Sequence, residues 1–149
     1  WSRLWMPCVG PSLRACRFWC AFRPRIGPPA VGSLDQTIAL SKVLKEHGVD
    51  VMDVSTGGIM SGVSIPVKPN YQVPFSEQVK AKADIPVTAV GLITKPKQAA
   101  KILAHGEADA VEIGRAALRD PYWPLRAANK LGIPSTEVPY APQYVAGAY

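Results

Sequence analysis

The stretch IPVTAVGLITKPKQAAKILAHGEADAVEIG, residues 85–114, decides the fold of this chain. It begins and ends with a short run rich in Val, Ala and Ile, and each run closes on a glycine, Gly91 or Gly114. Such runs are typical of buried strands in a parallel sheet. The segment between them, residues 95–106, has a proline near its start and a glycine at its end, which predicts a helix. Strand, helix and strand with short connections predict a right-handed parallel crossover.

The same alternation continues on both sides of this stretch. Upstream, the sequence predicts a helix over 33–48 capped at Ser33, then a strand over 49–55 buried on both faces, then a helix over 74–84. The apolar face expected for the first of these helices comprises Ile38, Leu40, Val43 and Leu44. Downstream, a last helix over 115–132 is expected to break near Pro121 and Pro124. The fold class is therefore α/β with parallel strands, although periodicity alone does not separate a barrel from an open doubly wound sheet.

Residues 1–32 differ from the rest of the chain in composition. They hold all three cysteines and five arginines but no acidic residue, and they show neither helical nor strand periodicity. A disordered or targeting extension is one interpretation. Reading the same codons in the neighbouring frame allows VEAVDAVRRAVPAGLPLLVRISATDW, a helix followed by a strand, so we favour a frameshift near Gly32–Ser33. We expect an irregular leader over 1–32, an α/β region over 33–132 and an irregular tail over 133–149.

Composition restricts the functional class. The 149 residues are 48% hydrophobic, and no apolar run approaches the roughly 20 residues of a membrane span. The net charge of +6 comes almost entirely from the leader, so the remainder offers no basic patch that predicts nucleic-acid binding. Because the cysteines are confined to the leader, neither a disulfide framework nor a metal site is expected. We predict a cytoplasmic protein that binds neither membrane nor nucleic acid.

Three of the predicted strands end in residues suited to binding an anion. Ser55 follows one strand, Val90 and Gly91 end the next, and Gly114-Arg115 end the third. The carboxyl ends of parallel strands share one edge, where backbone N–H groups and an arginine fork bind phosphate well. A glycine at a strand end also serves as a simple turn residue. Arginine at a helix start is disfavoured by the helix dipole, which favours a phosphate cradle of Gly91, Gly114 and Arg115.

These segments resemble a known family. HGVDVMDVSTGG, NYQVPFSEQVKAKADIPV, IPVTAVGLIT and HGEADAVEIGRAALRDPYWPLRAA are similar, in this order, to the last three strands of the old yellow enzyme family, in particular its shorter bacterial NADPH-dependent ene-reductases. The resemblance implies the C-terminal part, strands 6–8, of an FMN-binding (β/α)₈ TIM barrel that takes hydride from NAD(P)H and reduces electron-poor C=C bonds of enone-type substrates. It places Gly91 and Gly114-Arg115 at the FMN phosphate, and Ser55 and Gly57-Gly58 on the rim near the flavin.

The resemblance also implies what the chain lacks. The family's substrate-binding His pair, its proton-donating Tyr and the Arg facing the flavin ring belong to upstream segments, so we predict no catalytic residue here. Ala146 stands near the place where this branch offers an Arg to a neighbouring subunit of a homo-oligomer. A non-catalytic, truncated or pseudogene-derived remnant is the alternative. An aldolase-like or synthase-like phosphate-binding barrel is a third hypothesis, which the absence of Lys at the three strand ends disfavours.

Other residues receive structural roles. We expect His47 and His105, each before a glycine, to cap helix ends rather than take part in catalysis. Asp50 and Asp53 have no partner acid or metal-ligand spacing. The remaining expectations concern Tyr71 and Gln72, which either line a substrate entrance or anchor their loop, and Tyr122 and Trp123, which pack the last helix against the barrel.

Overall fold

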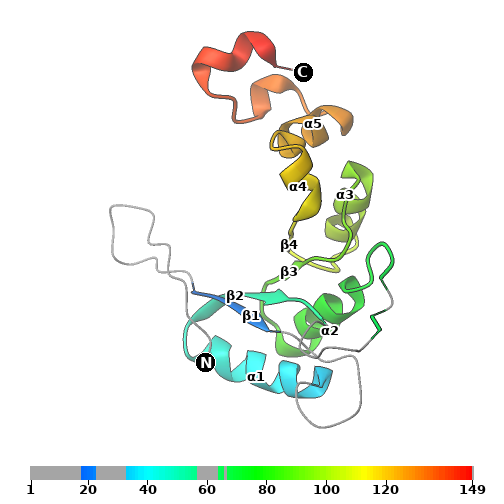
Figure 1. Ribbon diagram of the computed structural model, residues 1–149. Coiled ribbons are helices and arrows are strands. Elements are labelled where there is room, and N and C mark those ends of the chain that lie inside the picture. The colour runs from blue at the N-terminus through cyan, green and yellow to red at the C-terminus, as the bar shows by residue number, and fades with distance from the viewer. Residues whose placement is uncertain (1–17, 23–32, 57–63, 66, 149) are drawn as a thin grey trace.

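A computed structural model describes residues 33–56, 64–65 and 67–148 of the chain, together with the backbone of residues 18–22. Four parallel strands form one sheet in the order β1-β2-β3-β4, which is also their order along the chain (Figure 1). The strands are β1 (Phe18–Phe22), β2 (Val49–Val54), β3 (Val87–Ala89) and β4 (Ala110–Val111). The predicted α/β class with parallel strands is confirmed.

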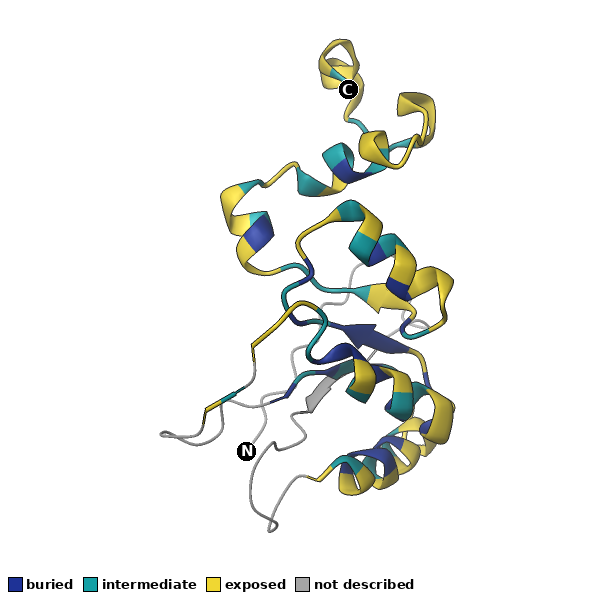
Figure 2. Ribbon diagram, turned by 90° about the vertical axis from the view of Figure 1, so that its right-hand side faces the viewer, coloured by how far each residue is buried: buried dark blue, intermediate teal, exposed yellow. Residues whose placement is uncertain are grey.

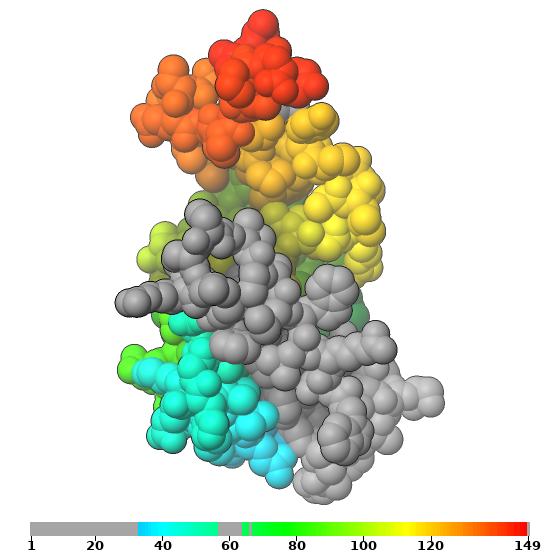
Figure 3. Space-filling view, turned by 90° about the vertical axis from the view of Figure 1, so that its left-hand side faces the viewer, coloured from blue at the N-terminus to red at the C-terminus, as the bar shows by residue number. Residues whose placement is uncertain are grey.

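Helices connect the strands and continue beyond them. They are α1 (Leu34–Glu46), α2 (Val73–Ala83), α3 (Pro96–Ala104), α4 (Arg115–Arg119) and α5 (Trp123–Lys130), and two short 3₁₀ helices follow at Ser135–Glu137 and Pro142–Gly147. The predicted break in the last helix falls between α4 and α5. From α5 onward the chain forms an extension at the end of the molecule away from α1 (Figures 1 and 3).

Local sequence explains how α1 begins. The Ser33 side chain accepts the Gln36 N–H at 3.3 Å, and Gln36 Oε1 accepts the Ser33 N–H at 3.1 Å, which completes a capping box. The buried residues of α1 are Thr37, Ile38 and Ser41, whereas Val43 is 49% exposed. The predicted apolar face is therefore wrong at Val43. The buried hydroxyls of Thr37 and Ser41 are both hydrogen-bonded, because each donates to a backbone carbonyl one turn earlier in the helix.

The core lies between the sheet and its helices, as the burial colours show (Figure 2). Met52, Val54, Val87 and Ala89 are completely buried at 0% exposure. On the other face of β2, Val49, Val51 and Asp53 are only partly buried. The expectation that the strand over 49–55 is buried on both faces is therefore wrong. Helices α1 and α2 contact β2 and lie on the same side of it (Figure 1). Side chains alternate between the two faces of a strand, so only one set of β2 side chains faces these helices.

The expected leader over residues 1–32 lies outside the described residues except for β1. There the structure differs from the expected irregular segment, because Phe18–Phe22 pairs in parallel with β2 along Phe18↔Val49 to Phe22↔Val54. Backbone pairing with an available strand edge does not require periodic side chains. The described part of the tail, residues 133–148, contains the two 3₁₀ helices between stretches without regular secondary structure.

Candidate functional site: a cavity at the carboxyl ends of β3 and β4

The strand register brings the predicted anion-binding residues to one edge of the sheet. Asp53 pairs with Thr88 and Val54 with Ala89, while Ala89 pairs with Val111. The residues that follow the three strands therefore leave the sheet at the same edge. Ser55, Val90 and the Gly114-Arg115 pair all come from these strand ends, as the sequence predicts.

A cavity of about 140 Å³ lies at this edge. Four of the five predicted cofactor-binding residues line it: Val90, Gly91, Gly114 and Arg115. Ser55 is partly buried and is not among the lining residues. Gly57 and Gly58 lie outside the described residues. The remaining lining residues come from the loop before α2, the loop after β3 and the β4–α4 connection, and they are Tyr71, Gln72, Leu92, Ile93, Thr94, Glu112 and Ala116.

The two cavity glycines serve different purposes. Gly91 has φ +122°, and a Cβ there would lie 3.1 Å from Gln72 Cγ and 3.2 Å from the Gln72 backbone nitrogen. The fold itself therefore requires glycine at position 91. Gly114 has a negative φ of −84°, and a Cβ there would meet no atom within 4 Å. Neither a positive φ nor a close neighbour accounts for Gly114, so its open side is available to a ligand.

Arg115 supplies the positive charge of the cavity. Arg115 is exposed, and its guanidinium forms no ion pair with any described residue. In contrast, Arg126 binds Asp120 at 2.5 Å. An unpaired guanidinium presents parallel N–H donors that match the oxygen pairs of a phosphate or carboxylate. The donor chemistry of the cavity therefore fits a phosphate group.

One acidic residue lines the same cavity. Glu112 follows β4, and its Oε1 accepts a hydrogen bond of 2.6 Å from the hydroxyl of Thr88, a fully buried residue of β3. Glu112 N–H is bonded to the carbonyl of Ala89 at 2.8 Å. Backbone and side chain thus hold the carboxylate at the strand end, where it forms no ion pair with Arg115. Sequence reasoning missed Glu112, although its place just before Gly114-Arg115 put it on the same edge.

Gln72 joins the ends of β2 and β3. This residue is 5% exposed, its Oε1 accepts the N–H of Thr56, and its Cβ and Cγ pack under Gly91. Of the two roles expected for Gln72, anchoring the loop is what these contacts perform. Tyr71 lines the cavity beside it.

The other residues considered from sequence lie away from the cavity. His47 and His105 occupy the C-cap positions of α1 and α3, as predicted, and His47 Nδ1 lies 2.8 Å from the carbonyl oxygen of Val43. Trp123 packs against the core and donates to the carbonyl of Thr94 at 3.2 Å. Tyr122 is 66% exposed, so its predicted packing against the barrel is wrong. Tyr122 is the N-cap residue of α5, whose first turn contains Pro124, so Tyr122 lies in the turn between α4 and α5.

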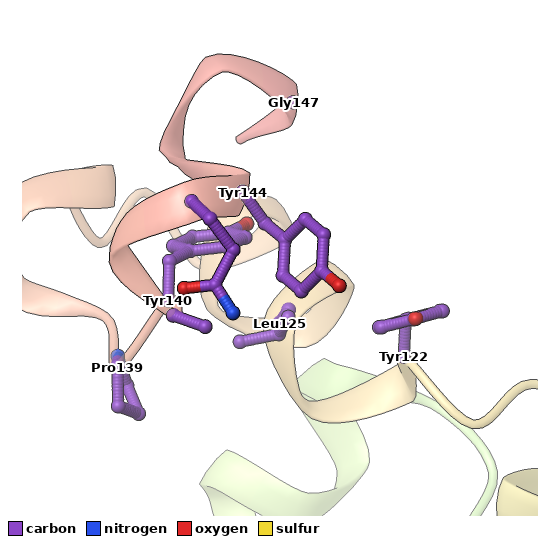
Figure 4. A pocket seen from close by; sticks show the side chains of 8 residues that line it. Tyr122, Leu125, Pro139, Tyr140, Tyr144 and Gly147 are labelled. Carbon is purple, nitrogen blue, oxygen red and sulfur yellow. The ribbon is translucent and has the colours of Figure 1, made fainter.

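A larger cavity of about 560 Å³ lies between α5 and the tail (Figure 4). It is lined by Tyr122, Leu125, Pro139, Tyr140, Ala141, Gln143, Tyr144 and Gly147, none of which is charged. Size alone does not make it the better candidate, because it has no charged donor and none of the predicted binding residues. In the described ranges of the chain, no cluster of three or more His, Cys, Asp or Glu is suited to a metal ion.

Comparison with known proteins identifies the family. The sequence model of the NADH:flavin oxidoreductase / NADH oxidase family matches residues 28–133, and the chain belongs to this family. An NADPH dehydrogenase of Geobacillus thermodenitrificans (strain NG80-2) is 51% identical over 92 residues, which cover 62% of this chain and 27% of that protein. An NADPH dehydrogenase of Geobacillus sp. (strain WCH70) is 46% identical over 110 residues, covering 74% and 31% respectively.

The matched region is only part of these relatives, since the chain spans less than a third of their length. Among solved structures, a dihydropteroate synthase of Xanthomonas albilineans with 4-aminobenzoic acid gives a TM-score of 0.48 at 21% identity, covering 81% of this chain and 46% of that one. That likeness carries no argument about function. Every helix in the described ranges is too short or too polar to cross a membrane.

Proposed function

We propose that this chain carries the FMN-phosphate-binding part of an FMN-dependent NAD(P)H oxidoreductase of the ene-reductase type. The observation that carries the proposal is the cavity lined by Gly114, whose Cα side is open, and by Arg115, which forms no ion pair with any residue that the structure describes. The cavity volume of about 140 Å³ is several times the roughly 30 Å³ that one water molecule occupies in the liquid, so the cavity has room for a group of phosphate size. Membership of the flavin oxidoreductase family supports FMN as the source of that phosphate.

Each cavity residue has a definite role in this proposal. The Arg115 guanidinium donates paired N–H groups to phosphate oxygens, and the missing Cβ of Gly114 lets the backbone approach them. Gly91 sets the course of the loop after β3, and the Thr88–Glu112 hydrogen bond fixes the carboxylate. When bound, FMN supplies hydride transfer from NAD(P)H to an electron-poor C=C bond. The chain's residues orient and hold its phosphate end.

We further propose that β2, β3 and β4 are strands 6, 7 and 8 of a (β/α)₈ barrel, with residues 33–132 as the barrel segment. Their sequential parallel order supports a barrel, because an open doubly wound sheet reverses its strand order at a switch point. The parent enzyme is proposed to be a cytoplasmic homo-oligomer acting on enone-type small molecules. The relatives named NADPH dehydrogenase support NADPH as co-substrate.

The test is FMN binding by the 149-residue chain, followed through the fluorescence anisotropy of the flavin, which rises when FMN is bound at either end. Replacing Arg115 by Ala removes charge-assisted hydrogen bonds worth about 1.5–3 kcal/mol, or about 10- to 150-fold in affinity. Arg119→Ala is the matched control, because Arg119 is an exposed arginine of the same helix that does not line the cavity. Equal affinity of R115A and wild type, or no FMN binding by the wild type, contradicts the proposal.

A further inference from the structure

The loop after β3 is held by one side chain from the helix that follows it. Gln98 of α3 accepts the N–H of Thr94 with Oε1 at 3.0 Å and that of Lys95 at 3.3 Å. Its Nε2 donates to the carbonyl of Leu92 at 2.9 Å. Both ends of the Gln98 amide are therefore bonded to the loop that lines the cavity, which runs from Gly91 to Thr94.

A second segment closes the arrangement. Gln98 Nε2 also donates to Asn70 Oδ1 at 2.5 Å, and the Asn70 N–H donates to the carbonyl of Gly91 at 3.0 Å. Asn70 precedes α2 and is 28 residues from Gln98 in sequence. The loop is thus bonded from two sides, by α3 and by the turn before α2. We call Asn70 and Gln98 the loop clamp.

The clamp acts on a conformation that the loop does not favour by itself. Leu92 has φ +52°, in the left-handed region that is costly for a residue with a Cβ, and it directly follows Gly91 at φ +122°. Such strain persists where surrounding structure determines the conformation. Gln98 bonds the carbonyl of Leu92 itself, so the strained residue and the clamp are in direct contact.

Resting on the proposed function, we infer that Gln98, with Asn70, is a positioning residue for the FMN phosphate. Neither residue lines the cavity, so the clamp acts through the loop. A loop held in its binding conformation loses less entropy when the ligand binds, which raises affinity. The clamp also fixes where the loop's backbone groups stand relative to the guanidinium of Arg115.

Two substitutions separate the clamp from general stability. Gln98→Met keeps the side-chain length and removes every hydrogen bond of the amide. Asn70→Gly suits the φ of +63° at that position, keeps the backbone bond to Gly91 and removes only the side-chain acceptor. Gln78→Met is the matched control, since Gln78 lies on α2 and its amide bonds only residues of that helix: Nε2 donates to the carbonyl of Pro74 at 3.4 Å, and Oε1 accepts from Lys82 Nζ at 3.3 Å.

The experiment is titration of the chain with FMN, followed by phosphorus-31 NMR, with circular dichroism to verify folding. The dissociation constant reports affinity, and the limiting shift at saturation reports the phosphate's surroundings whatever fraction is folded. We expect about tenfold weaker binding for Q98M and a smaller loss for N70G. In Q98M and N70G, the limiting phosphorus-31 chemical shift of bound FMN moves toward that of free FMN. Q78M behaves as wild type.

Each other result has a distinct meaning. If wild type shifts the FMN resonance but the folded variants match it in affinity, the clamp inference is wrong. Weaker binding with the wild-type limiting shift, accounted for by an equal loss of folded protein in circular dichroism, makes Gln98 a stability residue only, which also overturns the inference. If Q98M does not fold, N70G decides by the same criteria. A wild-type chain that leaves the FMN resonance unmoved overturns the proposed function and the clamp together.

Discussion

Replacing Gly91 by Ala should destabilise the chain through two separate effects. At φ +122° a residue with a Cβ pays a backbone cost of about 1–3 kcal/mol. The new Cβ would lie 3.1–3.2 Å from Cγ, Cβ and the backbone nitrogen of Gln72, which is 5% exposed and bonded to Thr56. Crowding of this kind adds about 1–3 kcal/mol, because the backbone nitrogen cannot turn away as a flexible side chain can. The expected total is about 2–6 kcal/mol.

Two further glycines allow the effects to be measured separately by urea unfolding. Gly106 has φ +71° and no atom within 4 Å of a built Cβ, so Gly106→Ala pays the backbone cost alone. Gly114 has neither a positive φ nor a close neighbour, so Gly114→Ala should change the free energy of unfolding by no more than about 0.5 kcal/mol. The predicted order of destabilisation is G91A, then G106A, then G114A. If G91A is no less stable than G106A, the contact between Gly91 and Gln72 is not as described.

Three further predictions concern stability and activity. Ser33→Ala removes the acceptor of the α1 capping box and should lower the free energy of unfolding by about 1 kcal/mol, measured by urea denaturation. Burial raises the pKa of Asp109, but the hydrogen bond and charge of Lys80 and the Val87 N–H lower it more, so the pKa lies below its ordinary value. A carboxyl group whose pKa is lower in the folded than in the unfolded protein stabilises the fold at pH values above the unfolded pKa. The contribution of Asp109 should therefore fade as the pH falls below about 3.8, the ordinary pKa of the group, toward the folded pKa. Asp109→Asn should abolish that part of the acid dependence, which is measured by comparing the free energy of unfolding at pH 7 and pH 2.5. The isolated chain with added FMN should not oxidise NADPH, because it spans less than a third of the length of its relatives and the resemblance places the flavin-ring contacts and the proton donor outside the segments that match; sustained loss of absorbance at 340 nm would refute this.

Much of the fold was predictable because its signals are local. Ser33 starts α1 through a contact with a residue three positions away, and Pro74 near the start of α2 suits a first helical turn. Glycines after short apolar runs located the strand ends. The exposure of Val43 was not predictable, because which face of α1 is buried depends on where α2 and the sheet lie. The length of β4, two residues, likewise depends on its neighbour β3.

Part of the candidate site could likewise be predicted from local sequence signals, and part depends on contacts between distant residues. Gly91, Gly114 and Arg115 were found because each follows a strand, and the register of the sheet brings such residues to one edge. The reason for Gly91 was not visible in sequence, since it depends on contact with Gln72, nineteen positions earlier. The partnership of Gln98 with Asn70 was equally hidden, although Gln98 stands at the third position of a helix, where a capping glutamine is common.

A crystal structure of the chain with FMN would show whether this cavity holds the phosphate of FMN. We expect phosphate oxygens within about 2.7–3.2 Å of the Arg115 guanidinium, over the open side of Gly114. A phosphate bound elsewhere, for example in the tyrosine-lined cavity beside α5, or an Arg115 side chain that makes no contact with bound FMN, would contradict this expectation.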